Sequence, residues 1–411
     1  MTSPPRVVVT GIGVVSTVGV GVDHFWQALL DGQVGTGSVT LFDTGDYATS
    51  VAGQIPDWVS DHYTPAPLVP VGVTPSRSES FAVAAGRLAF QDAGLDRGGL
   101  EAAGYRPARC GVITGMVTGN RPAVEATIHR IRGGEDPGPR LPQPVSMSAW
   151  PALDLGLRGL VRVLPMACAA GNAAIADGMD LLRSGAADLI LAGGADELSE
   201  AMFLMFDRLR AFSPDRVRPF DPARRGLILG EGAAYLVLER EEDARRRGAQ
   251  LYGVVAGHGN FADAHHMTAP HPQGTGATRS IRRALEMAGL GVEDVDHINA
   301  HGTGTPANDE VEALVLAQLL GRRARDVPVT ALKSGLGHAQ GAASALEAAA
   351  CLLSIRHGIV PPTVNTTACD YDIDLVLGEA RRTQVRVALN NSFGFGGNNC
   401  CVVLQSAAEP R

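Results

Sequence analysis

Lysine is almost absent from this chain of 411 residues. Of its 35 basic residues only Lys333 is a lysine, and the others are arginines. Such a bias is typical of a GC-rich coding sequence, in which arginine serves wherever either base would do. Because a compact ammonium and a planar guanidinium bind their partners differently, the one remaining lysine is a candidate for a position that arginine does not fill.

Cysteine and aromatic residues are also scarce. The six cysteines, at positions 110, 168, 351, 369, 400 and 401, follow no metal-ligand spacing and no disulfide framework. This pattern argues against a disulfide-stapled extracellular domain and favours a reducing cytoplasm, with no bound metal. Aromatic residues make up 5% of the chain, whereas glycine accounts for 50 residues, which indicates tight turns and close backbone packing.

Long apolar runs and a positive net charge are both missing. The formal net charge is −8 at pH 7, which argues against a nucleic-acid or anionic-membrane partner. No apolar run is long enough to span a membrane. Residues 6–22 superficially resemble a secretory signal, but glycines interrupt them and β-branched residues prevail. A strand and a turn are the better interpretation of this segment.

What the chain does contain is an alternation of strand-like and helix-like runs. Its length and its 45% hydrophobic content indicate a globular protein with two domain-sized halves, 1–248 and 249–411. The alternation predicts an α/β fold with largely parallel sheets covered on both faces. More local predictions are loops over 31–75 and 133–144, buried strands over 160–164 and 188–194, and a charged helix over 239–247.

Cys168 lies in a run of small residues between an expected strand, 160–164, and an expected helix, 169–182. A thiol at a helix N-terminus faces unpaired backbone N–H groups and the positive end of the helix dipole, which lower its pKa. Cys168 is therefore a candidate nucleophile. A buried structural cysteine is the alternative.

Three glycine-rich turns in the second half carry further chemically active side chains. They are His301-Gly302-Thr303-Gly304-Thr305-Pro306, Lys333-Ser334-Gly335-Leu336-Gly337-His338 and Asn390-Asn391-Ser392-Phe393-Gly394-Phe395-Gly396-Gly397. A single histidine is more often structural than catalytic, but active sites of α/β folds gather at the carboxyl ends of strands. Two histidines and the only lysine at such ends therefore predict one shared site.

Together with Ala167-Cys168-Ala169, these turns resemble the motifs of the β-ketoacyl-acyl-carrier-protein synthases. The closest class is the elongating one with a Cys-His-His site, found in fatty-acid and polyketide synthesis. The resemblance spans nearly the whole chain. It includes Val7-Val8-Val9-Thr10-Gly11, Arg218-Pro219-Phe220-Asp221, Gly230-Glu231-Gly232-Ala233 and Pro361-Pro362-Thr363-Val364-Asn365.

The resemblance implies a fold and a reaction. The fold is the thiolase fold, with two duplicated halves in a five-layer αβαβα sandwich, as a homodimer or as a heterodimer with a related subunit. The reaction is a decarboxylative Claisen condensation of an acyl chain with malonyl-acyl-carrier protein. The implied partner is the acyl carrier protein, whose phosphopantetheine brings the substrate, and no other cofactor is implied.

The resemblance and the chemistry together assign expected roles. Cys168 carries the acyl chain, and the backbone N–H groups of Cys168 and Phe395 form the acyl oxyanion hole. His301 and His338 stay neutral and donate from Nε to the enolate oxygen that forms when CO2 leaves, so each needs a partner on its other nitrogen. Lys333 orders the His338 side of the site.

Further residues are expected around the substrate. Thr303 and Thr305 bind the pantetheine arm, and Phe395 is the gating phenylalanine. Glu347 is expected in the substrate-binding part of the site, where it holds Lys333 or a water. Arg210, in an arginine-rich segment over 205–225, is expected to dock the acidic carrier protein.

Four positions depart from the family pattern. Met166 stands where Thr or Ser is commoner, and Asn398 stands where Thr is usual. Arg225 and Leu227 replace an acidic or amide residue and a phenylalanine. All four are expected near the acyl pocket or the gate, and they leave the chain length and the substrate open.

Three other functions are alternatives. A chain-initiating synthase that uses acyl-CoA has a Cys-His-Asn site and lacks the Lys333–His338 element. A degradative thiolase needs a second catalytic cysteine, for which Cys400 and Cys401 are the only candidates near the C-terminus. A chain-length-setting partner subunit replaces the nucleophile, whereas Cys168 is present.

Overall fold

The computed structural model describes residues 4–63, 75–96, 98–136 and 143–408. In these ranges the strands of both halves join in one 12-stranded sheet. The first half contributes β1 (Val7–Ser16), β5 (Cys110–Gly115), β6 (Val161–Leu164), β7 (Leu189–Asp196) and β8 (Gly232–Arg240), with β2 (Gly19–Val20) paired to β1. The second half contributes β9 (Gly253–Ala262), β10 (His297–Asn299), β11 (Pro328–Thr330), β13 (Asp374–Leu375), β15 (Val387–Gly394) and β16 (Asn398–Gln405).

The strand order shows that the two halves repeat one topology. The first half runs β1-β8-β7-β5-β6, and the second runs β9-β16-β15-β10-β11 with β13 added at its end. Cys168 follows the third strand of the first half, β6, and Lys333 follows the corresponding strand of the second half, β11. The duplication that the resemblance implies is therefore present in the fold. The predicted boundary at 248/249 stays a prediction.

The predicted predominance of parallel strands is wrong for the middle of the sheet. Pairs β5·β6, β5·β7, β10·β11, β10·β15 and β11·β13 are parallel. Pairs β1·β8, β1·β9, β7·β8, β15·β16 and β9·β16 are antiparallel. Local alternation of strands and helices does not record that the first, fourth and fifth strands of each half meet in space.

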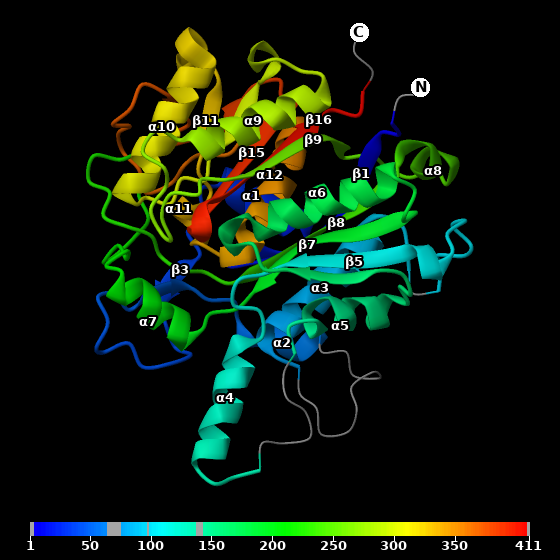
Figure 1. Ribbon diagram of the computed structural model, residues 1–411, viewed down its shortest axis with the longest axis horizontal. Coiled ribbons are helices and arrows are strands. Elements are labelled where there is room, and N and C mark those ends of the chain that lie inside the picture. The colour runs from blue at the N-terminus through cyan, green and yellow to red at the C-terminus, as the bar shows by residue number, and fades with distance from the viewer. Residues whose placement is uncertain (1–3, 64–74, 97, 137–142, 409–411) are drawn as a thin grey trace.

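Helices divide the molecule into five layers (Figure 1). The outer layer of the first half holds α3 (Arg77–Asp92) and α5 (Ser146–Leu155), and that of the second holds α9 (Thr275–Ala288) and α10 (Pro306–Leu320). Between the parts of the sheet that belong to the two halves lie α6 (Ala170–Arg183) and α12 (Ala343–His357). Residues 343–354 of α12 are buried on every side, which fits its central place. The expected αβαβα sandwich is confirmed.

The shorter elements correct several local predictions. They are α1 (Val22–Leu30), β3 (Thr36–Ser38), β4 (Val51–Gly53), α2 (Asp57–Tyr63), α4 (Arg121–Arg132), α7 (Glu200–Arg208), α8 (Glu241–Arg246), α11 (Lys333–Leu336), β12 (Ile359–Val360) and β14 (Arg381–Arg382). Residues 31–63 thus hold two short strands and a helix rather than only loop, whereas 64–74 and 137–142 lie outside the described residues. The charged helix starts at Glu241, because Glu239 still belongs to β8 and is buried against Arg247.

Two segments near the active cysteine differ in exposure from expectation. The strand predicted as buried, β6, is half-exposed along its whole length, because it is the last strand of the sheet and has a described partner on one side only. The turn expected over 390–397 begins as strand, since β15 continues to Gly394.

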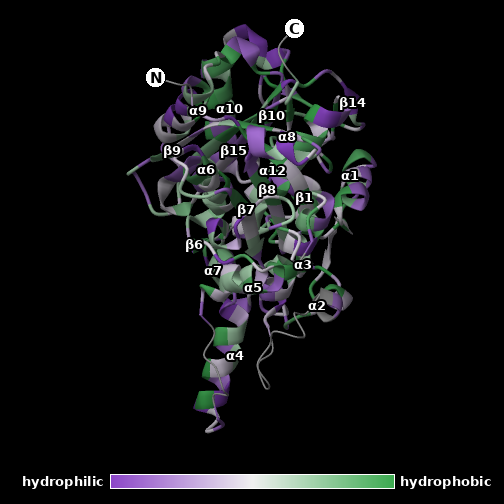
Figure 2. Ribbon diagram, turned by 90° about the vertical axis from the view of Figure 1, so that its right-hand side faces the viewer, coloured by the Kyte–Doolittle hydropathy of each residue, from purple (hydrophilic) through white to green (hydrophobic). Residues whose placement is uncertain are grey.

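In Figures 1 and 2, α4 projects from the body, and its Ile128 and Ile131 are exposed. No helix among the described residues is long and apolar enough to cross a membrane.

Candidate active site

Cys168 lies at the floor of a pocket with a volume of about 350 Å³. A 3₁₀ turn, Ala167–Ala169, connects β6 to α6 and carries the cysteine. Ala167 adopts a left-handed backbone with φ of +50°. The Cys168 carbonyl oxygen accepts hydrogen bonds from Ser392 Oγ at 2.8 Å and Ser344 Oγ at 3.3 Å. Two hydroxyl groups of the second half of the chain therefore hold the cysteine backbone of the first half in place.

The prediction that the position at the helix N-terminus gives this thiol a lowered pKa is wrong. Burial raises the pKa of Cys168 to about 11. Lys333 and the backbone N–H groups of Cys168 and Phe395 act in the opposite direction without overcoming the loss of hydration. The same two N–H groups point at the sulfur, as an acyl oxyanion hole at this position requires.

His338 is the nearest ionisable side chain to the thiol. Its Nε2 lies 3.1 Å from Cys168 Sγ, and its Nδ1 accepts the backbone N–H of Gln340 at 3.0 Å. An acceptor at Nδ1 leaves the proton on Nε2, which faces the thiol. Burial, with a smaller contribution from the Lys333 charge, holds the pKa of His338 well below its usual value. The expected neutral tautomer, with its backbone partner, is what the geometry supports.

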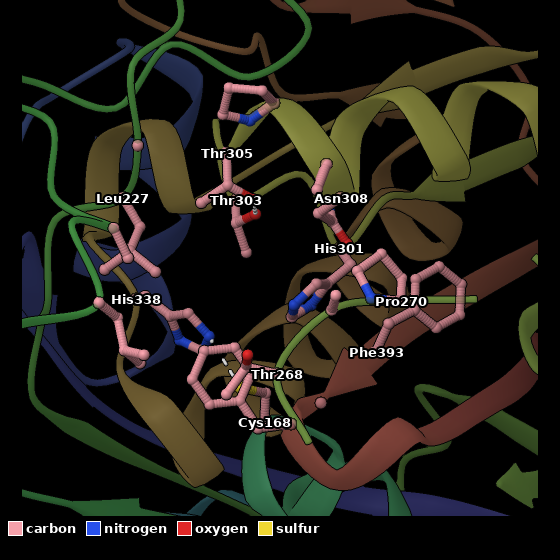
Figure 3. Close-up of a pocket in the computed structure, with 18 of the residues that line it drawn as sticks. Cys168, Leu227, Thr268, Pro270, His301, Thr303, Thr305, Asn308, His338 and Phe393 are labelled. Atoms are coloured by element: carbon pink, nitrogen blue, oxygen red, sulfur yellow. Dashed lines mark hydrogen bonds between the residues drawn. The ribbon is translucent and has the colours of Figure 1, made fainter. Parts of the chain in front are cut away.

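His301 completes the group on the opposite wall (Figure 3). The His301 and His338 ring centroids are 5.6 Å apart and the rings are nearly perpendicular. Burial and the Lys333 charge lower the pKa of His301, so it too is neutral. Its main-chain N–H donates to Glu312 Oε1 at 2.8 Å, but its Nδ1 has no partner among the described residues. The expected second partner is thus found for His338 and not for His301.

Lys333 and Glu347 form a buried ion pair behind the histidines. Lys333 Nζ lies 2.6 Å from Glu347 Oε1, and each side chain is 1% exposed. Neither residue lines the pocket. The expectation that Glu347 belongs to the substrate-binding surface is therefore wrong, and the alternative that it holds Lys333 is correct. The charge of Lys333 nevertheless reaches the site, because it helps to lower the pKa values of His301 and His338.

Threonines and aromatic rings form the pocket walls. Thr303 and Thr305 line the pocket and their hydroxyl oxygens lie 2.8 Å apart (Figure 3). Phe395 stacks on Phe206, with ring centroids 5.5 Å apart. The lining residues not predicted from sequence include Phe206, Asp263, Thr268, Pro270, Asn308, Phe393 and Asn399. Most of them lie outside the recognised motifs, so their sequence carries no local signal.

The departures from the family pattern separate into two groups. Leu227 and Arg225 line the pocket, and Arg210 lies at the same mouth. Asn398 does not line it but donates from Nδ2 to the Phe395 carbonyl oxygen at 3.0 Å, so it holds the backbone at Phe395. Met166 does not line the pocket either, and its sulfur lies 3.8 Å from Asn260 Nδ2.

Two buried carboxylates organise the loops and were not predicted. Asp196 accepts the backbone N–H groups of 117, 118, 119 and Gly341 at 2.6–2.8 Å, and burial raises its pKa to about 7. Glu312 accepts the N–H groups of His301 and Gly302, both at 2.8 Å. The available signal was an acid at the end of an apolar strand, and another in the first turns of the helix after the His301 motif.

The nucleophile and the histidines also have a spacing that a metal ion could use. The donor atoms of Cys168, His301 and His338 all lie within 4.8 Å of one another. Thiolate and imidazole are the ligands that zinc prefers. The sequence predicts no metal here, and this stays a prediction.

Comparison with known proteins identifies the family. The models of the N-terminal and C-terminal domains of beta-ketoacyl synthase match residues 5–244 and 252–367. The chain belongs to the β-ketoacyl synthase family. It is 38% identical to a 3-oxoacyl-[acyl-carrier-protein] synthase 2 of Synechocystis sp., over 96% of each chain. It is 36% identical to the tetracenomycin polyketide synthase ketoacyl synthase alpha subunit of Streptomyces glaucescens, over 99% of this chain and 98% of that one.

Solved structures agree with this assignment. The ishigamide ketosynthase/chain length factor structure matches with a TM-score of 0.91 and 37% identity, over 99% of this chain and 100% of that one. The chain is thus an acyltransferase of the ketosynthase type, which forms carbon–carbon bonds. The thiolase alternative fails because Cys400 and Cys401 are fully buried and line no part of the pocket.

The raised pKa of Cys168 predicts how this ketosynthase responds to alkylation. Below pH 11 the thiol is mostly protonated, so the rate of alkylation by iodoacetamide should rise about tenfold per pH unit from pH 7 to pH 10. Peptide mapping should place the first label on Cys168, because Cys110, Cys351, Cys400 and Cys401 are buried. A plateau near pH 7, or earlier labelling of half-buried Cys369, would contradict this prediction.

Proposed function

We propose that this ketosynthase accepts an acyl chain from a carrier protein onto Cys168. It then condenses this chain with malonyl-carrier protein in fatty-acid or polyketide synthesis. The observation that carries the proposal is the convergence of one thiol and two neutral imidazoles. Cys168 Sγ lies 3.1 Å from His338 Nε2, with His301 on the facing wall of the same pocket. A chain-initiating synthase does not share this pair of histidines.

The first step is acyl transfer between two thiols. Cys168 Sγ attacks the thioester carbonyl carbon, the carbon–sulfur bond to the carrier breaks, and the proton of the cysteine passes to the departing pantetheine sulfur. The N–H groups of Cys168 and Phe395 already point at this region, and they hold the oxyanion of the tetrahedral intermediate. Because these donors are backbone groups, the step does not depend on the charge of a side chain.

The second step needs donors on the opposite side of the pocket. When malonyl thioester loses CO2, negative charge develops on the thioester oxygen, and Nε2–H groups of His301 and His338 stabilise it. The enolate carbon then attacks the acyl carbon on Cys168, the carbon–sulfur bond to the cysteine breaks, and the departing thiolate takes up a proton from water. Both imidazoles remain neutral because burial and the nearby Lys333 charge lower their pKa values. Neutral donors avoid an extra charge that would trap the carboxylate of malonate.

The protein needs no resident cofactor in this proposal, because the phosphopantetheine arm belongs to the carrier.

A dimer with a second copy or with a related subunit fits the free edge of the sheet at β6, since an unpaired edge strand is stable when another strand covers it. Cysteines that are all free fit a cytoplasmic location. Relatives support the partners: one structure is entitled a type II PKS acyl-carrier protein in complex with its ketosynthase.

The direct test uses the purified chain with acyl-carrier and malonyl-carrier protein. Mass spectrometry should show an acyl adduct on Cys168, and release of CO2 should match the β-ketoacyl product. Cys168→Ala should give neither adduct nor product. An acyl adduct on another cysteine, or product formed by Cys168→Ala at the wild-type rate, would overturn the proposal. The same assay with acyl chains of different length then shows which chains the enzyme accepts, and so defines the pathway.

Arg210 is expected to bind the carrier protein by its charge. This arginine is exposed at the pocket mouth, so Arg210→Glu should raise the KM for carrier-bound substrate about tenfold or more and weaken its dependence on salt. Transfer from a small thioester without phosphate should be unchanged. Arg322→Glu is the matched control, because Arg322 is exposed beyond the far end of α10. An equal loss with both substrates would mean a structural role for Arg210.

A further inference from the structure

Two arginines without an ion pair line the mouth of the catalytic pocket. Arg210 follows α7, Arg225 lies on the segment before β8, and both are exposed and line the pocket. In the same basic segment, Arg218 is held by two hydrogen bonds from its guanidinium to Asp215, at 2.7 and 2.8 Å. Within the described ranges of the chain, no carboxylate lies in ion-pair distance of Arg210 or Arg225. These two cations are therefore left for an external anion.

The backbone places the two arginines beside each other. A parallel bridge joins Phe212 to Leu227. Two residues earlier on each segment stand Arg210 and Arg225, and neighbouring backbones in such a pairing lie about 5 Å apart. Gly226 makes the approach possible, because a Cβ there would lie 2.2 Å from a carbonyl oxygen of the facing segment. The chain path therefore brings the two segments that carry these arginines side by side.

The conformation of Arg210 adds a second observation. Its φ is +53°, in the left-handed region that glycine occupies most readily after the end of a helix. An L-residue is less stable than glycine in this conformation. The presence of an arginine in this unfavourable conformation is explained when its side chain is needed at the mouth of the pocket.

The pair also lies in line with the substrate channel. A Cβ on Gly304 would lie 2.9 Å from the carbonyl oxygen of Gly226, so the segment that carries Arg225 touches the turn between Thr303 and Thr305. Arg225, which is exposed, therefore lines the same pocket as the two hydroxyls and Cys168. A pantetheine arm laid along this path has its thioester at the floor and its phosphate at the mouth.

We propose that Arg225 and Arg210 together bind the phosphate group of the phosphopantetheine arm. This inference rests on the proposed function and assigns Arg225, the residue at which this chain departs from the family pattern, to the substrate. Each of the two guanidinium groups can donate two N–H bonds to phosphate oxygens. One phosphate can therefore bind the planar forks of both arginines, which a single carboxylate does less well. An acidic residue at position 225 would repel the same phosphate.

The test compares two small thioesters that differ only in the phosphate. S-acyl-pantetheine and S-acyl-4′-phosphopantetheine are used to acylate Cys168 in the full-length protein, and KM and kcat are measured for each. The wild type should have a KM about 10- to 100-fold lower for the phosphorylated thioester, as charge-assisted hydrogen bonds provide. In Arg225→Gln the two KM values should converge. Arg322→Gln should retain the wild-type ratio.

The remaining outcomes distinguish a failure of the phosphate site from a failure of the proposed function. A wild-type ratio retained in Arg225→Gln, or KM raised equally for both thioesters, would overturn the phosphate site. So would a rise in KM confined to the carrier-bound substrate, since Arg225 would then contact acidic side chains of the carrier. If the wild type acylates Cys168 with neither thioester nor with acyl-carrier protein, the proposed function itself fails.

Discussion

Lys333→Arg should fold normally and lose about 10²–10³-fold in malonyl decarboxylation. The side chain of Lys333 is 1% exposed, and among the described residues its ammonium donates one hydrogen bond, at 2.6 Å, to the equally buried Glu347. A guanidinium is larger, planar and needs more acceptors than this site offers, so it displaces the turn that leads to His338. The positive charge is kept, and the two imidazoles therefore stay neutral. What changes is the position of the two imidazoles as hydrogen-bond donors.

A matched variant separates shape from charge. Lys333→Met has nearly the length of lysine and no charge, so it tests whether the charge alone supports the histidines. If the shape of the side chain determines the rate, Lys333→Arg and Lys333→Met should have equally low rates of decarboxylation. In both variants acylation of Cys168 should fall less, because the backbone oxyanion hole is separate from the ion pair. Decarboxylation by Lys333→Arg near the wild-type rate would show that the single lysine is an accident of composition.

Gly171→Ala should lower both the stability and the activity of the enzyme. Gly171 is the second residue of α6, three residues after Cys168, where α6 packs against α12. A Cβ there would lie 2.8 Å from the backbone nitrogen of Ala345 and 2.9 Å from the carbonyl oxygen of Gly341. Because backbone atoms cannot swing away as side chains do, the two central helices must separate. We expect a cost of about 1–3 kcal/mol in the free energy of unfolding. The rate of condensation should fall about 10²-fold, since α6 follows the cysteine turn and α12 follows His338.

Gly178→Ala is the control on the same helix. Its Cβ would meet side-chain atoms instead, at 2.9 Å from Leu238 and 3.2 Å from Ile190. This variant should lose stability by a similar or smaller amount while the condensation rate per folded molecule stays near that of the wild type. Thermal unfolding and single-turnover condensation measure the two effects. A Gly171→Ala enzyme with wild-type condensation would show that the spacing of the central helices does not set the site geometry.

The catalytic group was predictable because its members occupy turns with strong local signals. Cys168, His301 and His338 each follow a strand and lie among glycines or other small residues, and the structure brings them to one pocket. The pKa of Cys168 was not predictable in this way. Helix position is local, but the walls that remove water from the sulfur come from both halves of the chain.

Strand direction and edge exposure were beyond local sequence for the same reason. Val161–Leu164 is apolar enough for a buried strand, yet it ends the sheet, and the pattern of residues does not say which strand is last. Glu347 shows the converse. From the sequence it is expected in the substrate-binding part of the site, holding Lys333 or a water, and only the packing shows that it binds Lys333 and does not line the pocket.

The strand β9 has a consequence for how the chain is connected. On one edge Val254 and Val255 pair with Val8 and Val7 near the start of β1, and on the other edge they pair with Gln405 and Leu404 at the end of β16. The first and last strands thus flank the same two residues, about 10 Å apart across two strand spacings. A short bridge between these ends, with new termini opened between α8 and β9, gives a circular permutant. Every strand pairing of the sheet, and both turns that form the site, are retained in that permuted order.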